Sequence, residues 1–172
     1  MKHTGSSSMQ GMAPVEVIDR VRALRTAPLL HGFTDVGLRI LAGASSQRTV
    51  GRGTYAFRAG EPSAALCVIA RGTLHLLPRE GGQALGEIGP GDTYGGVALL
   101  LGGEHLLSGW AATDVDLVVL SKATFEALQK DKPGAALKLE IALARDLIER
   151  LREAKGPLRE FLAWQISRRN QA

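Results

Sequence analysis

The sequence predicts a mainly β protein with flanking helices, in which an all-β barrel or sandwich occupies the middle of the chain. Between residues 47 and 121, short apolar runs alternate with glycine-rich turns, which is typical of antiparallel strands. Before residue 44 and after residue 121, apolar residues recur at helical spacing. The length of 172 residues suits one domain with short terminal extensions.

The first residues, 1–12, predict a flexible leader that need not be native, since Met9 and Met12 are alternative natural starts. The leader lacks the apolar core of a signal peptide, and no apolar run approaches the roughly 20 residues of a membrane span. A single cysteine, Cys67, excludes an internal disulfide framework and fits a reducing compartment, so we expect a cytoplasmic location. Cys67 lies in an apolar run and is interpreted as a small buried hydrophobe.

Helices are predicted on both sides of the β region. Residues 13–26 have helical apolar spacing, and Thr34 can cap a second short helix. Ser121 can cap a helix over 122–130, and Pro133 opens a long helix that runs to about residue 154. The domain therefore spans 13–154. Residues 155–172 form a tail, in which Lys155-Gly156-Pro157 precedes a last helical segment over 158–166.

The strands are predicted from the apolar runs and the turns between them. The predicted strands cover 54–58, 66–71, 73–78, 83–88, 108–112 and 115–120. Four consecutive apolar residues, 117–120, indicate a strand that is buried on both faces. No repeat of solenoid length is present.

The segment 94–100, Tyr-Gly-Gly-Val-Ala-Leu-Leu, and the later His105-Leu106-Leu107-Ser108 carry a family resemblance. They resemble the phosphate-binding cassette of the cyclic nucleotide-binding domain family, which runs Phe-Gly-Glu-Leu-Ala-Leu, a spacer, then Arg-Ala-Ala-Thr. Four further segments resemble the family's landmarks in the correct order: 28–34, 53–61, 66–74 and 85–92. The resemblance covers about 24–152 and extends to catabolite activator/Fnr-like proteins and to regulatory subunits of cAMP-dependent kinase. It implies an antiparallel double-stranded β-roll (jelly roll) with N-terminal helices and a long C-terminal helix.

Two polar residues of the family cassette are absent from this chain. Gly96 stands where the resemblance implies a Glu for the ribose 2′-hydroxyl, and His105 stands where it implies an Arg for the phosphate. Each charge-assisted hydrogen bond contributes about 1.5–3 kcal/mol, so the loss of two weakens family-like binding by about 10² to 10⁴-fold. His105 is expected to be mostly neutral at pH 7. Leu106 and Leu107 are expected to narrow the pocket.

The predicted cassette is therefore a degenerate ligand site. Gly95 is expected to let the backbone approach a ligand closely, and residues 97–100 are expected to form one helical turn whose free N–H groups face an anion. A plain turn at Gly95-Gly96 and a loop histidine without a role stay open as alternatives. The candidate ligand-binding residues are Tyr94, Gly95, Gly96, Val97, Ala98, Leu99, His105, Leu106, Leu107 and Ser108.

The long helix carries a second candidate surface. Its apolar residues step by four and three over two heptads, as in a helix that pairs with a partner helix. We expect a homodimer through this stripe, with a single face packed on the chain's own barrel as the alternative. The stripe residues are Leu137, Ile141, Ala144, Ile148 and Leu151, and a second row is formed by Leu139, Leu143 and Leu147.

The residues after the long helix bear on DNA binding. In transcription factors of this family, a helix-turn-helix domain of several dozen residues follows this helix. Residues 156–172 are too few for that domain, so no sequence-specific DNA binding is expected. The apolar tail, with Trp164 as its anchor, is expected to dock on the β-roll or on another protein.

Other classes of function rest on weaker patterns. A cupin-like enzyme needs closely spaced metal-binding histidines, whereas His31, His75 and His105 stand apart, and no catalytic Ser-His-Asp or Cys-His arrangement is visible. A haem or redox sensor would rest on Cys67 and His75, which both lie in predicted strands. Non-specific nucleic acid binding would use the basic clusters at 20–25 and 168–169. These clusters contribute to a net charge of +4 and are interpreted as solvated helix faces.

The sequence thus predicts a non-catalytic regulatory or sensor module that acts by protein–protein contact, with weak or altered ligand binding. The alternative is a functional receptor for cAMP, cGMP or a cyclic dinucleotide in signal transduction. No metal and no membrane contact are expected, and the only cofactor considered is a weakly held cyclic nucleotide. The expected partners are a second copy of the chain and an unidentified protein.

Overall fold

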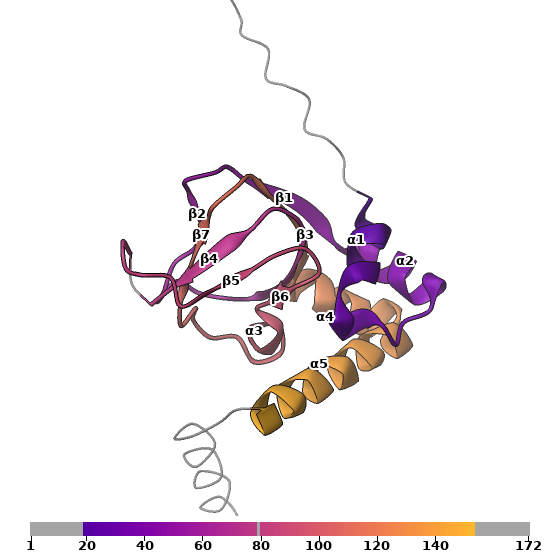
Figure 1. Cartoon of the computed structure of the whole chain (residues 1–172). Coiled ribbons are helices and arrows are strands. Elements are labelled where there is room, and N and C mark those ends of the chain that lie inside the picture. The colour runs from indigo at the N-terminus through magenta and orange to yellow at the C-terminus, as the bar shows by residue number, and fades with distance from the viewer. Residues whose placement is uncertain (1–18, 79, 154–172) are drawn as a thin grey trace, which may run out of the picture.

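Two antiparallel sheets form a β-roll, and the helices gather at one side of it (Figure 1). The computed structural model describes residues 19–78 and 80–153. One sheet has the strand order β1-β8-β3-β6, and the other has the order β2-β7-β4-β5. The strands are β1 (Ser46–Val50), β2 (Tyr55–Phe57), β3 (Ala65–Arg71), β4 (Leu74–Leu77), β5 (Gly86–Ile88), β6 (Thr93–Tyr94), β7 (Ser108–Ala111) and β8 (Val115–Ser121).

The N-terminal helices start at polar caps. The Asp19 carboxylate accepts a hydrogen bond from the backbone N–H of Arg22 at 3.1 Å, so α1 (Arg20–Thr26) begins at residue 20. The prediction of a helix from residue 13 is therefore wrong at residue 19, which is extended, and residues 13–18 lie outside the described part. A 3-10 turn, η1 (Pro28–Leu30), follows, and then Thr34 caps α2 (Asp35–Ala44) as predicted.

The later helices also follow the sequence signals. Ser121 caps α4 (Lys122–Asp131), and Pro133 opens the long helix α5 (Pro133–Glu153). A short helix, α3 (Gly96–Leu101), connects β6 to the loop before β7, and α5 contacts it (Figure 1). The predicted segment 158–166 lies outside the described residues.

Strands β3 and β8 separate two hydrophobic cores. Their inward side chains, with Ile69 and Leu117 fully buried, pack against the second sheet inside the roll. Their outward side chains, with Val68 and Val118, pack against the helices, where Leu139 of α5 is fully buried. The prediction that 117–120 is buried on both faces is confirmed, and the double core fixes α5 against the roll.

The strand prediction differs from the structure at the ends of the sheets. All six predicted strands exist, but the predicted 83–88 shortens to β5 because residues 83–85 are irregular, with a bend at residue 85. Strands β1 and β6 were not predicted. β1 is mostly exposed and pairs with β8 alone, and β6 has only two residues, so neither carries an apolar run. No helix within the described residues is long and apolar enough to cross a membrane.

Candidate functional site

A cavity of about 420 Å³ lies where the predicted cassette faces the long helix. Its walls come from β6 and α3, from the loop before β7, and from the C-terminal half of α5. The lining residues are Ser63, Thr93, Tyr94, Gly95, Gly96, Val97, Ala98, Gly102, Glu104, His105, Leu106, Leu143, Asp146, Leu147 and Arg150. The structure therefore brings the two halves of the predicted cassette together and adds a wall from α5.

Gly95 holds the corner at which the chain turns from β6 into α3. Its φ is 79°, and a Cβ atom on it would lie 2.0 Å from the carbonyl oxygen of Ala65. Only glycine combines this left-handed backbone with this close approach to β3. The predicted need for glycine at this position has a structural reason, which is the packing of the cassette on β3.

Gly96 lets α5 approach the cassette. A Cβ atom on Gly96 would lie 2.6 Å from Cδ2 of Leu143, a side chain that is only 7% exposed. Leu66 lies behind the same position, at 3.8 Å. The space in which a longer side chain at residue 96 would begin is thus filled by Leu143 of the long helix.

His105 is held by backbone hydrogen bonds on both sides. Its N–H donates to the carbonyl of Glu61 at 2.9 Å, and its carbonyl accepts from the N–H of Gly60 at 2.8 Å. Its ring stacks on Phe57 with centroids 4.4 Å apart and a tilt of 23°. Burial lowers the pKa of His105, and the nearby Glu61 carboxylate opposes this only in part. The imidazole therefore favours its neutral form in the cavity wall.

Tyr94 points its hydroxyl into the roll rather than to solvent. Its ring lies 4.6 Å from that of Phe57, and its oxygen has no hydrogen-bond partner of good geometry among the described residues. Burial, and next the adjacent Cys67 thiol, raise the pKa of Tyr94 well above its usual range. Burial likewise raises the pKa of Cys67, although Tyr94 and Arg48 lower it somewhat. Both groups are neutral, so neither supplies a charge to the cavity.

The α5 wall brings charges that the cassette pattern does not contain. The Nε of Arg150 donates to Oδ2 of Asp146 at 2.7 Å, and this hydrogen bond is the main reason that the pKa of Arg150 is raised. Glu104 lies on the opposite wall. The described lining residues thus include two carboxylates, those of Glu104 and Asp146, and one guanidinium, that of Arg150. Arg150 already binds Asp146.

Three of the predicted site residues do not line the cavity. Leu99 is 1% exposed and packs in the helical core. The hydroxyl of Ser108 accepts a hydrogen bond from the N–H of Ala59 at 3.0 Å and is buried. Leu107 lies outside the lining, and Leu106 lines the rim but stays largely exposed. The expectation that Leu106 and Leu107 narrow the pocket stays a prediction, since Leu106 is a lining residue and Leu107 is not.

Sequence reasoning missed Asp146, Leu147 and Arg150 as lining residues. The sequence places Leu143 and Leu147 in a second apolar row of the long helix, but it does not show where that row meets the cassette. The spacing of four between Asp146 and Arg150 was the available signal for their ion pair. Their common place on one helical face with Leu143 would have grouped them as one wall.

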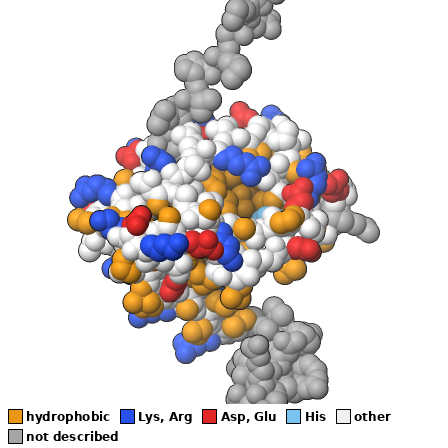
Figure 2. Space-filling model, turned by 180° about the vertical axis from the view of Figure 1, so that it is seen from behind, with side chains coloured by type: hydrophobic (Ala, Val, Ile, Leu, Met, Phe, Trp, Pro, Cys, Tyr) orange, Lys and Arg blue, Asp and Glu red, His pale blue; other side chains and the backbone are white. Residues whose placement is uncertain are grey.

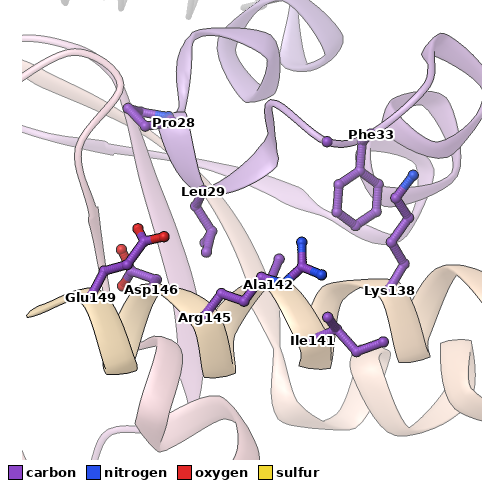
Figure 3. A pocket seen from close by; sticks show the side chains of 10 residues that line it. Pro28, Leu29, Phe33, Lys138, Ile141, Ala142, Arg145, Asp146 and Glu149 are labelled. Atoms are coloured by element: carbon purple, nitrogen blue, oxygen red, sulfur yellow. The ribbon is translucent and has the colours of Figure 1, made fainter. Parts of the chain in front are cut away.

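A second cavity, of about 450 Å³, lies on another side of α5, between this helix and η1 (Figure 3). Figure 3 shows Leu29 pointing into it from η1 and Arg145 lying along the helix side. The ammonium of Lys138 lies 5.2 Å from the ring centre of Phe33. This cavity contains none of the predicted cassette residues.

The residues considered for metal, haem and nucleic acid binding lie in different parts of the fold. In the ranges 19–78 and 80–153, no three His, Cys, Asp or Glu side chains gather as metal ligands. Cys67 lies on β3 and His75 on β4, which belong to different sheets, and the His75 ring lies 5.9 Å from that of Trp110. Of the basic cluster at 20–25, Arg25 pairs with Asp35 at 2.9 Å. The basic residues 168–169 lie outside the described residues.

The exposed stripe on α5 matches the predicted pairing face. Leu137, Ile141 and Ile148 are large hydrophobic side chains with exposed surface, whereas Leu139 and Leu143 are buried in the core. Ala144 is also exposed, and Leu151 is half-buried. Figure 2, the view from behind, shows hydrophobic side chains along the lower edge of the molecule, at the height of α5 in Figure 1.

Comparison with known proteins points to one family. The sequence profile of the cyclic nucleotide-binding domain matches residues 47–132. The cyclic AMP receptor protein of Thermus thermophilus is 31% identical over 152 residues, which cover 87% of this chain and 68% of that protein. The crystal structure of the N-terminal domain of a transcriptional regulator from Streptomyces coelicolor superposes with a TM-score of 0.67 at 27% identity. That match covers 78% of this chain and 98% of the other.

The structure of the Thermus thermophilus catabolite activator protein gives the same result. It matches with a TM-score of 0.60 at 31% identity over 74% of this chain and 61% of that one. The profile match contains strands β2 to β8 and the predicted cassette, whereas the α5 wall of the cavity lies beyond it. The chain belongs to the cyclic nucleotide-binding domain family.

Proposed function

We propose that this protein is a non-catalytic regulatory module whose cyclic nucleotide pocket has been altered, and that it acts through contacts with other proteins. The observation that carries the proposal is the contact between Gly96 and Leu143. Position 96 offers no side chain to a ligand hydroxyl, and Leu143 fills the space in which such a side chain would start. At this point the cassette and the long helix pack directly against each other.

The charges of the cavity support the proposal that an anionic nucleotide binds only weakly. His105, which replaces the Arg implied by the resemblance, is kept neutral by burial. Arg150 is engaged by Asp146, and Glu104 adds a negative charge to the wall. A phosphate entering the cavity therefore meets no free cation among the described lining residues, and it must compete with Asp146 for Arg150.

A functional cyclic nucleotide receptor is the second candidate, and two observations favour it. The relative from Thermus thermophilus is named a cyclic AMP receptor protein. The guanidinium of Arg150 also lies on the cavity wall, where it can exchange Asp146 for a phosphate at a modest electrostatic cost. This candidate assigns the phosphate to α5 rather than to residue 105.

Calorimetry on the purified protein separates the two candidates. Titration with cAMP, cGMP and cyclic dinucleotides is expected to give weak binding or none. Tight binding that is lost on Arg150→Gln would establish the receptor, with the phosphate held by α5. Tight binding that is lost on His105→Ala would instead contradict the view that residue 105 has lost its role. Arg145→Gln, on the side of α5 that lines the other cavity, is the matched control.

Homodimerisation through α5 is part of the proposal. Exposed Leu137, Ile141 and Ile148 repeat at the spacing of a helix pair, and two heptads are short for stable pairing by themselves. Light scattering after size exclusion is expected to give a dimer that Ile141→Glu dissociates. Leu85→Glu, at an exposed leucine just before β5 and away from α5, should leave the mass unchanged. A monomer of wild-type protein at high concentration would refute this part.

The absence of catalysis is likewise a proposal. It is supported by the membership of a family of nucleotide-binding domains and by the burial of Tyr94 and Cys67, which raises the pKa of each and keeps both groups protonated. Metal analysis and an absorption spectrum of the purified protein test it. A bound metal in stoichiometric amount, or a Soret band, would reopen the enzyme and haem-sensor classes.

A further inference from the structure

The cavity between η1 and α5 is separate from the cassette and has a different lining (Figure 3). Its volume of about 450 Å³ lies in the range of small-molecule sites, about 300–1,000 Å³. Residues of η1 and of the turn after it form one wall, and one face of α5 between Lys138 and Glu149 forms the other. Of its described lining residues, only Asp146 also lines the cassette cavity.

Part of this lining is apolar and within reach of a ligand. Leu29 and Phe33 line the cavity from the N-terminal side, and Ile141 and Ala142 line it from α5. Ile141 is 45% exposed, and the other three side chains are half-buried. An apolar ring placed between the two walls would remove surface of both from water, so it would be attracted to this place.

Two cations complete the lining, and neither belongs to an ion pair within residues 19–78 and 80–153. The ammonium of Lys138 lies 5.2 Å from the ring centre of Phe33, within the range of a cation–π contact. Figure 3 shows Arg145 extending along α5 from the side of Glu149 toward that of Lys138.

The carboxylates of the lining leave this positive charge only partly compensated. Asp146 accepts a hydrogen bond from Arg150 at 2.7 Å, so its charge is already neutralised by a residue outside this cavity. Glu149 lies one turn beyond Arg145 and about 16 Å along the helix from Lys138. Two cations therefore stand against the single remaining carboxylate of Glu149.

We infer that this cavity is a second binding site, for a small molecule that combines an apolar ring with one anionic group. The ring lies against Leu29, Phe33 and Ile141, where it is covered from both walls. The anionic group binds the guanidinium of Arg145, and Lys138 adds its attraction. Neither cation lines the cassette cavity, so this site does not depend on what the cassette binds.

NMR titration of the full chain with naphthoate, a fused aromatic ring that carries one carboxylate, tests the site. We expect a dissociation constant of about 0.1–1 mM and changes in the amide shifts of residues 28–33 and 138–149. Naphthamide has the same ring without the charge and should bind about 5- to 20-fold more weakly. Equal binding of the two compounds would overturn the inference, because it would show an apolar surface without an anion site. Shifts confined to residues 94–105, or no binding at millimolar naphthoate, would overturn it as well.

Charge variants test the roles of the two ends of the cavity. Arg145→Gln should weaken naphthoate binding by about 2- to 10-fold, and Glu149→Gln, which removes the opposing carboxylate, should strengthen it by about 2-fold. Lys130→Gln, at an exposed lysine of α4 outside the lining, is the matched control and should change nothing. If Arg145→Gln has no more effect than Lys130→Gln, the guanidinium does not hold the anion and the inference fails.

A filling variant tests the cavity itself. A Cβ atom on Gly32 would meet no atom within 4 Å, and the φ of this glycine is not positive, so Gly32→Leu is expected to fold and to block naphthoate. Shift changes in the same two segments on raising the protein concentration alone would show that a second copy occupies the cavity, and they would overturn a small-molecule site. No cyclic nucleotide is used in these titrations, so their failure is distinguishable from failure of the proposed function.

Discussion

Replacing Gly96 with Glu tests whether Leu143 of the long helix occupies the space in which a side chain at residue 96 would begin. The Cβ of the new side chain would start 2.6 Å from Leu143 Cδ2, about 1 Å inside ordinary contact distance. The Leu143 side chain can rotate away, but it is almost buried, so the rotation costs packing contacts. The new carboxylate is also placed unfavourably, beside this apolar side chain. Overpacking of this kind costs about 1–3 kcal/mol.

The decisive comparison is the double mutant. Leu143→Ala alone removes a buried leucine and should cost about 2–4 kcal/mol. In that background the space over residue 96 is open, so adding Gly96→Glu should cost little. The two changes should therefore be non-additive by at least about 1 kcal/mol, which urea unfolding midpoints at constant m-value resolve.

Gly43→Glu is the matched control for this cycle. Gly43 lies in α2, is exposed, and has no neighbouring atom within 4 Å of the point where a Cβ would lie, so a Glu there should be neutral or slightly stabilising. If Gly96→Glu costs no more than Gly43→Glu, or if its cost is unchanged by Leu143→Ala, Leu143 does not occupy that space. Calorimetry on the double mutant adds a functional readout, because only there is a carboxylate at residue 96 free to meet a ligand hydroxyl.

His105, Cys67 and Gly95 each allow a further test. The pKa of His105 is lowered in the fold, so below about pH 6.5 the unfolded chain binds more protons and the stability contributed by neutral His105 is lost as the pH falls. The difference in unfolding free energy between wild type and His105→Gln should therefore be constant above pH 7 and shrink toward pH 5; a difference independent of pH would contradict the shift. The Cys67 thiol, buried and with a raised pKa, should resist alkylation until urea unfolds the protein, as mass spectrometry would report, and rapid labelling of the native state would refute its burial. Gly95→Ala should cost about 2–4 kcal/mol in urea unfolding, since it combines a left-handed backbone with a clash against the Ala65 carbonyl, and an unchanged midpoint would be incompatible with this corner.

Local signals in the sequence accounted for the frame of the fold. Thr34 and Ser121 were identified as caps because a hydroxyl before an apolar period can accept the first free N–H groups, and both do so. Strand β8 followed from its apolar run. Strand β1 was missed because, apart from Val50, its side chains are at least partly in contact with water, so it has no hydrophobic pattern to find.

Only the part of the site that depends on neighbouring residues could be predicted from the sequence. The position of Gly95 and of α3 followed from the motif, since a short helix after a glycine corner is determined by neighbouring residues. The contact of Gly96 with Leu143 joins residues far apart in the chain, and no spacing rule connects them. The orientation of Leu106 depends on the backbone pairing of its loop with residues 59–63, which the sequence pattern does not reveal.

The long helix connects the pocket to the surfaces at which this protein would meet a partner. Leu143 faces the cassette and Ile141 and Ile148 face outward, all on one rigid element. Because Leu143 fills the space over Gly96, any group placed there has to move Leu143, and a movement of α5 as a unit would carry Ile141 and Ile148 with it. Under the proposed function, Gly96 and Leu143 thus set the position of the pairing face through packing, and the pocket binds nucleotides weakly.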